Sequence, residues 1–190
     1  MIGNNIYGGS VNTKKLIANF PLTSNIIDTL GNLTLVYTSG GTELTCNTNG
    51  FYMYKGELSF PDFSNLITGD YVEFEMQIQY ESSGTIEFPN YRRILWINKS
   101  LSCEINNNIP VMNVLGGNCL RTCGNTYNGT NYHKLIIRYD YTNKNVYFQF
   151  DNKEGYLCNY DNLSKNNIFV INKVNYGLNG YIKDLKIFTG

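Results

Sequence analysis

The stretch that decides the fold is Tyr132-His-Lys-Leu-Ile-Ile-Arg-Tyr-Asp-Tyr-Thr-Asn-Lys-Asn-Val-Tyr-Phe-Gln-Phe-Asp151. Apolar and polar residues alternate in both halves, which predicts two strands joined by a polar turn at residues 140–144. A hairpin with one apolar and one polar face is typical of an antiparallel sheet packed on a core. The apolar face would hold Leu135, Ile137 and Tyr139 of the first strand and Val146, Phe148 and Phe150 of the second.

Working outward, similar short strands fill the 190-residue chain, and no window of 11 or more residues has a helical period. We expect a loop at residues 62–68 with a helical turn, and no strand at 116–131. Residues 50–54 and 58–60 would form a hairpin. The other expected strands are 16–22, 33–37, 71–80, 93–97, 102–105, 111–115, 168–171 and 181–188. This pattern predicts a single all-β domain, an antiparallel sandwich of two sheets.

Composition excludes several classes of protein. The chain has 15 basic and 15 acidic residues and lacks a basic stripe, so we expect no nucleic acid partner. No apolar run reaches the roughly 18 residues of a membrane helix. The first residues lack the features of a signal peptide, which favours folding without export.

The five cysteines do not form a recognisable framework. They are Cys46, Cys103, Cys119, Cys123 and Cys158, an odd number without zinc-site spacing. We expect free thiols, with a Cys119–Cys123 disulfide as the alternative, and we expect no metal and no cofactor.

One strand breaks the alternation. Ile182 and Leu185 both look like core residues, yet they are three positions apart. A β-bulge within residues 183–184 would bury both, together with Ile187. The Asp184 side chain would then bond the backbone groups that the bulge leaves unpaired.

Four motifs in order resemble the concanavalin A-like lectin/glucanase jelly roll, in its laminin G-like branch. Residues 16–22 with Asp28-Thr-Leu-Gly31 are similar to the opening strand and its turn, and residues 69–77 to the long central strand. Residues 131–140 are similar to its Trp-His strand, with Tyr132 in place of the usual Trp, and residues 179–188 to its closing strand. The resemblance covers nearly the whole chain from Leu16 and implies a jelly roll.

Some members of this fold are glucanases or bind calcium. Glu73 and Glu75 share a strand face, roughly 6–7 Å apart, but the third acid of the glucanase motif is replaced by Ile78. We interpret the two as solvent-facing charges. Without a nucleophile motif, His133 is expected to make a structural hydrogen bond. Asp28 is expected to cap a turn rather than to bind calcium.

Residues 1–15 contain few core residues and are interpreted as an N-terminal arm, with residues 16–190 as the lectin-like domain. Residues 6–15 also resemble N-terminal segments of bacteriophage head- and tail-fibre proteins. This resemblance implies a virion protein made in the host cytoplasm.

Tyrosines in or beside loops are the best binding candidates, because flat rings stack on sugar faces. They are Tyr52, Tyr54, Tyr91, Tyr127 and Tyr132. The sequence therefore predicts a non-enzymatic virion appendage that contacts other virion proteins or itself, with possible glycan attachment. The alternative is a stand-alone carbohydrate-binding module.

Overall fold

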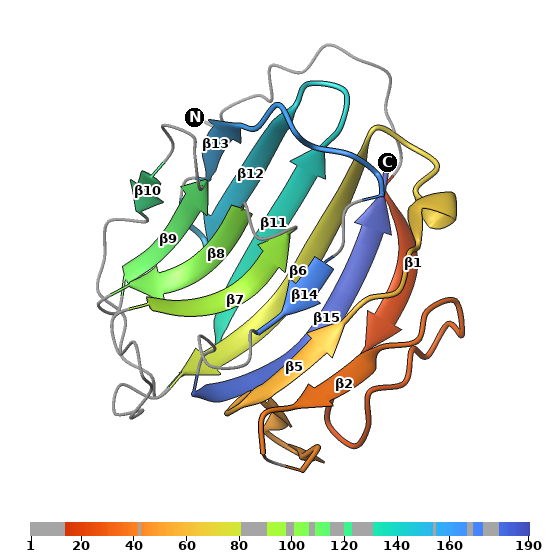
Figure 1. Ribbon diagram of the computed structural model, residues 1–190, viewed down its shortest axis with the longest axis vertical. Helices are drawn as coiled ribbons and strands as arrows, with labels where there is room; N and C mark the ends of the chain where they lie inside the picture. Colours follow the sequence, from red (N-terminus) through yellow and green to blue (C-terminus); the bar gives the residue numbers. More distant parts are fainter. Residues whose placement is uncertain are drawn as a thin grey trace.

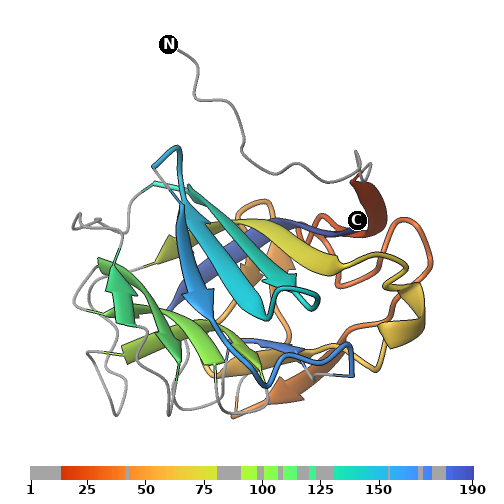
Figure 2. The ribbon, with the colours of Figure 1, turned by 90° about the horizontal axis from the view of Figure 1, so that it is seen from above.

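The computed structural model describes residues 14–41, 43–80, 91–97, 101–106, 109–114, 120–122, 131–153, 155–166, 169–172 and 179–190. Two antiparallel sheets lie face to face (Figure 1, Figure 2). The expected helical turn in residues 62–68 is the 3-10 helix η1 (Ser64–Leu66). Within the described ranges, no helix has the length and apolarity needed to cross a membrane.

Sheet 1 contains the predicted hairpin at residues 132–151. Its strand order is β13-β12-β11-β6-β15-β4-β3, and β1 also pairs with β15. The strands are β1 (Lys15–Phe20), β3 (Cys46–Asn47), β4 (Gly50–Tyr52), β6 (Tyr71–Tyr80), β11 (His133–Asp140), β12 (Asn145–Phe150), β13 (Tyr156–Asn159) and β15 (Gly180–Thr189).

Sheet 2 covers the inner face of sheet 1. Its strand order is β10-β9-β8-β7-β14-β5-β2. The strands are β2 (Val36–Ser39), β5 (Gly56–Ser59), β7 (Tyr91–Ile97), β8 (Leu101–Asn106), β9 (Ile109–Val114), β10 (Leu120–Thr122) and β14 (Phe169–Ile171).

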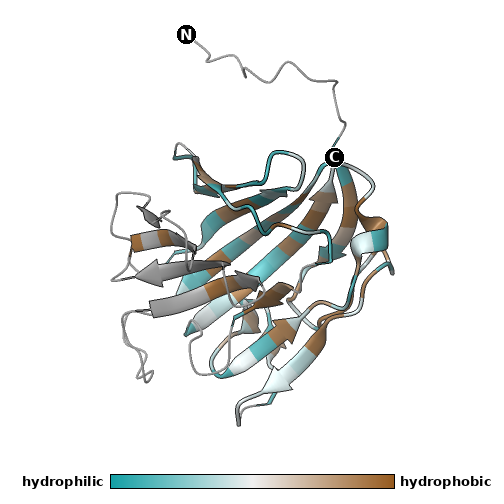
Figure 3. Ribbon diagram, turned by 45° about the horizontal axis from the view of Figure 1, so that its top comes forward, coloured by the Kyte–Doolittle hydropathy of each residue, from teal (hydrophilic) through white to brown (hydrophobic). Residues whose placement is uncertain are grey.

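The core lies between the sheets, and apolar and polar residues alternate along several strands in Figure 3. The inward residues expected from alternation are confirmed, since none is more than 1% exposed: Val72, Phe74, Met76, Ile78 and Tyr80 of β6, and the six apolar hairpin residues. Phe74 of sheet 1 and Phe169 of sheet 2 meet with ring centroids 4.9 Å apart. This contact between the two rings joins sheet 1 to sheet 2.

The predicted bulge in β15 is confirmed. The register with β6 shifts between Lys183 and Lys186, and Ile182, Leu185 and Ile187 are fully buried. Asp184 has a φ of 52°, in the left-handed region. Its backbone N–H donates to the Pro21 carbonyl at 3.1 Å, so this freed group is satisfied by the main chain rather than by the side chain.

The hairpin expected at residues 50–60 is wrong, because its two segments lie in different sheets. β4 pairs with β15 in sheet 1, and β5 pairs with β14 and β2 in sheet 2. Between them, the buried amide of Asn172 donates to the carbonyls of Met53 and Gly56. That side chain holds the chain at its crossing from one sheet to the other.

Two further expectations are corrected. Residues 33–35 do not continue β2, because the Asp28 carboxylate binds the N–H groups of Asn32 and Leu33 and leaves Thr34 in an isolated bridge. A short strand, β10, lies within residues 116–131, where none was expected, and it pairs with β9. The short strands β3 and β13 were not predicted either.

The cysteines are not all free thiols. Cys46 is free, as expected, and burial raises the pKa of its thiol. Cys158, buried in β13, is disulfide-bonded, so the expectation is wrong for this residue. The side chains of Cys103, Cys119 and Cys123 lie outside the described residues, and with them the Cys119–Cys123 alternative.

The first strand of the described residues, β1, begins at Lys15. Lys14 is already attached to sheet 1, where its ammonium bonds both Glu73 and Glu75. Glu73 also pairs with Arg138 at 2.6 Å, and Glu75 with Lys134 at 2.9 Å. The Glu73 side chain is only 2% exposed, so the interpretation of both acids as solvent-facing charges is wrong for Glu73.

The left-handed backbone at Asp184 should make its replacement sensitive to residue type. Asp and Asn tolerate this conformation, whereas other β-carbon residues lose roughly 1–2 kcal/mol. We expect Asp184→Ala to lower the free energy of unfolding by about 1 kcal/mol in urea titrations and Asp184→Asn to leave it nearly unchanged. Equal losses in the two variants would show that the carboxylate matters rather than the backbone.

Removing the Lys14 ammonium should make stability depend less on pH. Burial lowers the pKa of Lys14, but hydrogen bonds to Glu73 and Glu75 outweigh it, so the pKa is raised above 10.5. Burial raises the pKa of Glu75, but hydrogen bonds from Lys14 and Lys134 outweigh it, so the pKa is lowered below 4.5. The ion pair of Lys14 and Glu75 therefore stabilises the fold between pH 4.5 and pH 10.5. This stabilisation is lost as Glu75 becomes protonated at lower pH and as Lys14 loses its proton at higher pH.

We accordingly expect Lys14→Met to reduce the free energy of unfolding by about 1 kcal/mol at pH 7, since the lysine is partly exposed. The loss should shrink below pH 4.5 and above pH 10.5, the ordinary values for these groups. Lys15→Met is the matched control, because Lys15 follows Lys14 in sequence, is the first residue of β1 and is exposed. A loss that stays constant across pH would contradict the ion-pair explanation.

Candidate functional site

The outer face of sheet 1 carries polar and aromatic side chains opposite the apolar inner face. In register, Gln77 of β6 lies between Lys134 of β11 and Lys183 of β15. Two residues along β15, Tyr181 pairs with Tyr52 of β4. Because positions two apart point to the same side of a sheet, these residues form neighbouring rows on one surface.

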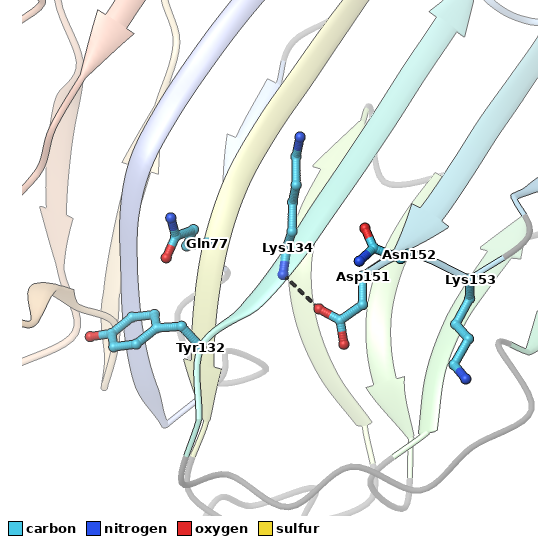
Figure 4. Close-up of a pocket in the computed structure, with 6 residues that line it drawn as sticks. All are labelled: Gln77, Tyr132, Lys134, Asp151, Asn152 and Lys153. Atoms are coloured by element: carbon cyan, nitrogen blue, oxygen red, sulfur yellow. Dashed lines mark hydrogen bonds between the residues drawn. The ribbon is translucent and has the colours of Figure 1, made fainter.

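An open depression of about 540 Å³ lies on this surface. In Figure 4, Tyr132 lies on one side, the turn after β12 lies on the other, and Gln77 and Lys134 lie between them. The lining residues are Gln77, Tyr132, Lys134, Asp151, Asn152 and Lys153.

Asp151 fixes the wall formed by the turn after β12. Its φ is 53°, and its carboxylate accepts hydrogen bonds from the Lys134 N–H at 2.9 Å and pairs with His133 Nδ1 at 2.9 Å. The His133 ring stacks on Phe150, with centroids 5.3 Å apart. The expected structural hydrogen bond of His133 is therefore confirmed. Asp151 is a positioning group for a turn that leaves Asn152 exposed.

Tyr132 forms the opposite wall and reaches across the sheet. Its hydroxyl donates to the carbonyl of Asn49, in the turn between β3 and β4. The Lys183 ammonium lies 3.7 Å from its ring centroid, a cation–π contact. Burial raises the pKa of the Tyr132 phenol, and the charges of Tyr181 and Asp184 raise it further. Tyr132 is thus neutral at pH 7 and held by contacts at both the hydroxyl and the ring.

A cluster of three tyrosines continues the surface beyond Tyr132. The Tyr52 ring lies 5.0 Å from Tyr181 and 6.2 Å from Tyr54, measured between centroids. The Tyr52 hydroxyl donates to the Asn179 side-chain oxygen at 2.9 Å. The three tyrosine rings are half-buried, so each still has surface available to a ligand.

The structure brings three of the five predicted tyrosines to one face: Tyr52, Tyr54 and Tyr132. Tyr91 begins β7 in sheet 2, and its side chain lies outside the described residues, as does all of Tyr127. The binding prediction missed Tyr181, Gln77 and the turn residues 151–153. Gln77 and Tyr181 hold outward positions of predicted strands, so alternation was the signal that could have identified them.

The other candidate residues have structural partners. Glu73 and Glu75 are paired with Lys14, Lys134 and Arg138 as described above. Asp28 caps its turn as expected: its two carboxylate oxygens accept four backbone N–H groups, those of residues 19, 30, 32 and 33. Among the residues described, no three His, Cys, Asp or Glu side chains are grouped to hold a metal ion.

No protein-family model and no curated protein matches the chain. Solved structures do match. Domain 4 of AbnA, a GH43 extracellular arabinanase from Geobacillus stearothermophilus, solved with arabinotriose, has a TM-score of 0.61 at 14% identity, over 93% of each chain. The carbohydrate recognition domain of Emp47p has a TM-score of 0.58 at 12% identity, over 93% of this chain and 97% of that one. An endo-1,3-beta-glucanase from Streptomyces sioyaensis has a TM-score of 0.58 at 11% identity, over 97% of this chain and 100% of that one.

These structures are lectin and glucanase-type domains. Together with the two antiparallel sheets, they confirm the predicted fold, an all-β jelly-roll sandwich of the concanavalin A-like kind. At these identities the likeness concerns the fold, because one fold carries many functions. The fold of this chain is that of a concanavalin A-like jelly roll.

Proposed function

We propose that this protein is a non-enzymatic carbohydrate-binding module whose site is the depression between Tyr132 and the turn at residues 151–153. Aromatic rings pack on the apolar faces of sugars, and amide groups bond their hydroxyls. The single observation that carries the proposal is that Tyr132 lines the same depression as the amides of Gln77 and Asn152.

The comparisons support a sugar as the ligand class. The AbnA domain was solved in complex with arabinotriose, and the Emp47p domain is a carbohydrate recognition domain. Both match this chain over nearly its whole length. Their low identities give no support to one particular sugar over another.

The pairing of the acids favours binding over hydrolysis. A glycosidase needs a carboxylic acid with a raised pKa beside a second carboxylate. Burial alone would raise the pKa of Glu75, but the hydrogen bonds from Lys14 and Lys134 lower it. Glu73 is enclosed by Lys14 and Arg138. Ion pairs of this kind suit a structural role.

A second proposal is the narrower one made from the sequence, a virion appendage attached through the N-terminal arm to other virion proteins or to itself. The observation that favours it is that Lys14, which follows the proposed arm in sequence, is held to sheet 1 by Glu73 and Glu75. The glycan site would then serve attachment of the virion to a cell surface.

Replacing Tyr132 should test the first proposal. The probes are immobilised arabino-oligosaccharides and β-1,3-gluco-oligosaccharides on a glycan array, followed by titration calorimetry on those that bind. We expect Tyr132→Ala to weaken binding about tenfold or more, equivalent to about 1.4 kcal/mol, because it removes one wall of the depression. Tyr132→Phe should lose less, since it keeps the ring and removes the bond to Asn49.

Tyr147→Ala is the matched control. Tyr147 lies on β12 in register with Arg138, which is roughly 20 Å along β11 from Tyr132. It should bind sugars like the wild type. Undiminished binding by a folded Tyr132→Ala variant would place the site elsewhere, and absence of binding to any glycan on the array would contradict the proposed function.

Deleting the arm should test the second proposal. Removal of residues 1–13 keeps Lys14 and all of β1, so the melting temperature should not change. We expect the deletion to reduce self-association or binding to a particle, measured by analytical ultracentrifugation and by co-sedimentation. An unchanged mass and unchanged particle binding would contradict a role of the arm in assembly.

A further inference from the structure

The tyrosine cluster lies on the same outer face of sheet 1 as the depression, beyond Tyr132. The strand order β12, β11, β6, β15, β4 leads from Asp151 at the end of β12 to Tyr52 on β4. Four interstrand spacings make this path about 19 Å long. That length exceeds one pyranose ring and suits a chain of several sugars.

The side chains along the path change from polar to aromatic in a way that suits an oligosaccharide. Gln77 and Lys134 line the depression, and the Lys134 ammonium is paired with Glu75. Tyr132 crosses toward Asn49. The Tyr181 and Tyr52 rings follow, 5.0 Å apart. Successive sugars would thus meet polar groups first and aromatic faces next.

The charges along this path are balanced. Three lysines, Lys134, Lys153 and Lys183, stand against three carboxylates, Glu75, Asp151 and Asp184. Lys134 is paired with Glu75, and Asp151 is paired with His133 and the Lys134 N–H. Lys183 lies over the Tyr132 ring, whose phenol feels the charge of neighbouring Asp184. A path without an excess of one sign does not select an anionic ligand over a neutral one.

We propose that the ligand is a neutral linear oligosaccharide of at least three sugars, bound across the strands from the depression to Tyr181 and Tyr52. This inference rests on the proposed carbohydrate-binding function. It adds the size and the charge class of the ligand and assigns Tyr181 and Tyr52 as a remote subsite. Tyr132 is the shared element between the two halves of the site.

The experiment is a chain-length series. Linear arabino- and β-1,3-gluco-oligosaccharides of one to six units are titrated into the full chain by calorimetry, with oligogalacturonates of the same lengths as anionic probes. In the wild type, we expect affinity to rise about tenfold or more between two and five units. Tyr181→Ala should abolish that rise and leave disaccharide affinity unchanged. Tyr181→Phe, which keeps the ring, is the matched control and should retain the rise.

Several outcomes would overturn the inference. If the wild type bound oligosaccharides of two and six units with equal affinity, the remote subsite would be contradicted, whereas the proposed carbohydrate-binding function would not. Tighter binding of oligogalacturonates that weakens with added salt would overturn the neutral class. No binding of any series would overturn the proposed function as well. Should Tyr181→Ala fail to fold, the wild-type length dependence decides the question.

Discussion

The chemistry of the outer face depends on the register in which β6 is held between β11 and β15. Ile78 of β6 pairs with His133 on one side and with Ile182 on the other. A slip of one residue would exchange the two faces of β6 and expose its five inward side chains. At about 1.5–3 kcal/mol each, this loss would be comparable to the whole stability of a domain. Core burial therefore fixes which polar and aromatic groups meet outside.

The bulge in β15 likewise determines which side chains of that strand point outward. The inward residues before and after the bulge are out of step by one position. Before it, Tyr181 and Lys183 point outward into the candidate site. After it, Phe188 points outward, where the Lys14 ammonium lies 3.9 Å from its ring centroid. The extra residue at Asp184 lets both halves keep apolar groups inside. The binding end and the ion-paired end of sheet 1 are thus joined by one irregularity.

Much of the fold followed from two-residue alternation, because alternation reports burial directly. β6, β11, β12 and the bulge were predicted closely for this reason. The crossing between β4 and β5 was missed, since it depends on Asn172, which lies more than a hundred residues away in sequence. The short strands β3, β10 and β13 have too few residues to show a period.

The candidate site was predicted in part. Loop tyrosines indicated Tyr52, Tyr54 and Tyr132, but no local pattern says that they share a face. Their grouping depends on β15 pairing with β4, a contact across more than a hundred residues. Likewise, Glu73 was expected in solvent because strand alternation does not reveal that Lys14 and Arg138 cover it.

The pairing of β1 with β15 determines which end of the sandwich lies opposite the tyrosine cluster. Lys15 lies beside Thr189, so the chain enters and leaves the sandwich at one end of β15 (Figure 1). Tyr181 lies at the other end, about 25 Å away along the strand. Attachment of the domain at this end of β15 would therefore orient the tyrosine cluster away from the anchor. An object held there would contact the ion-paired end of sheet 1 rather than the tyrosine cluster.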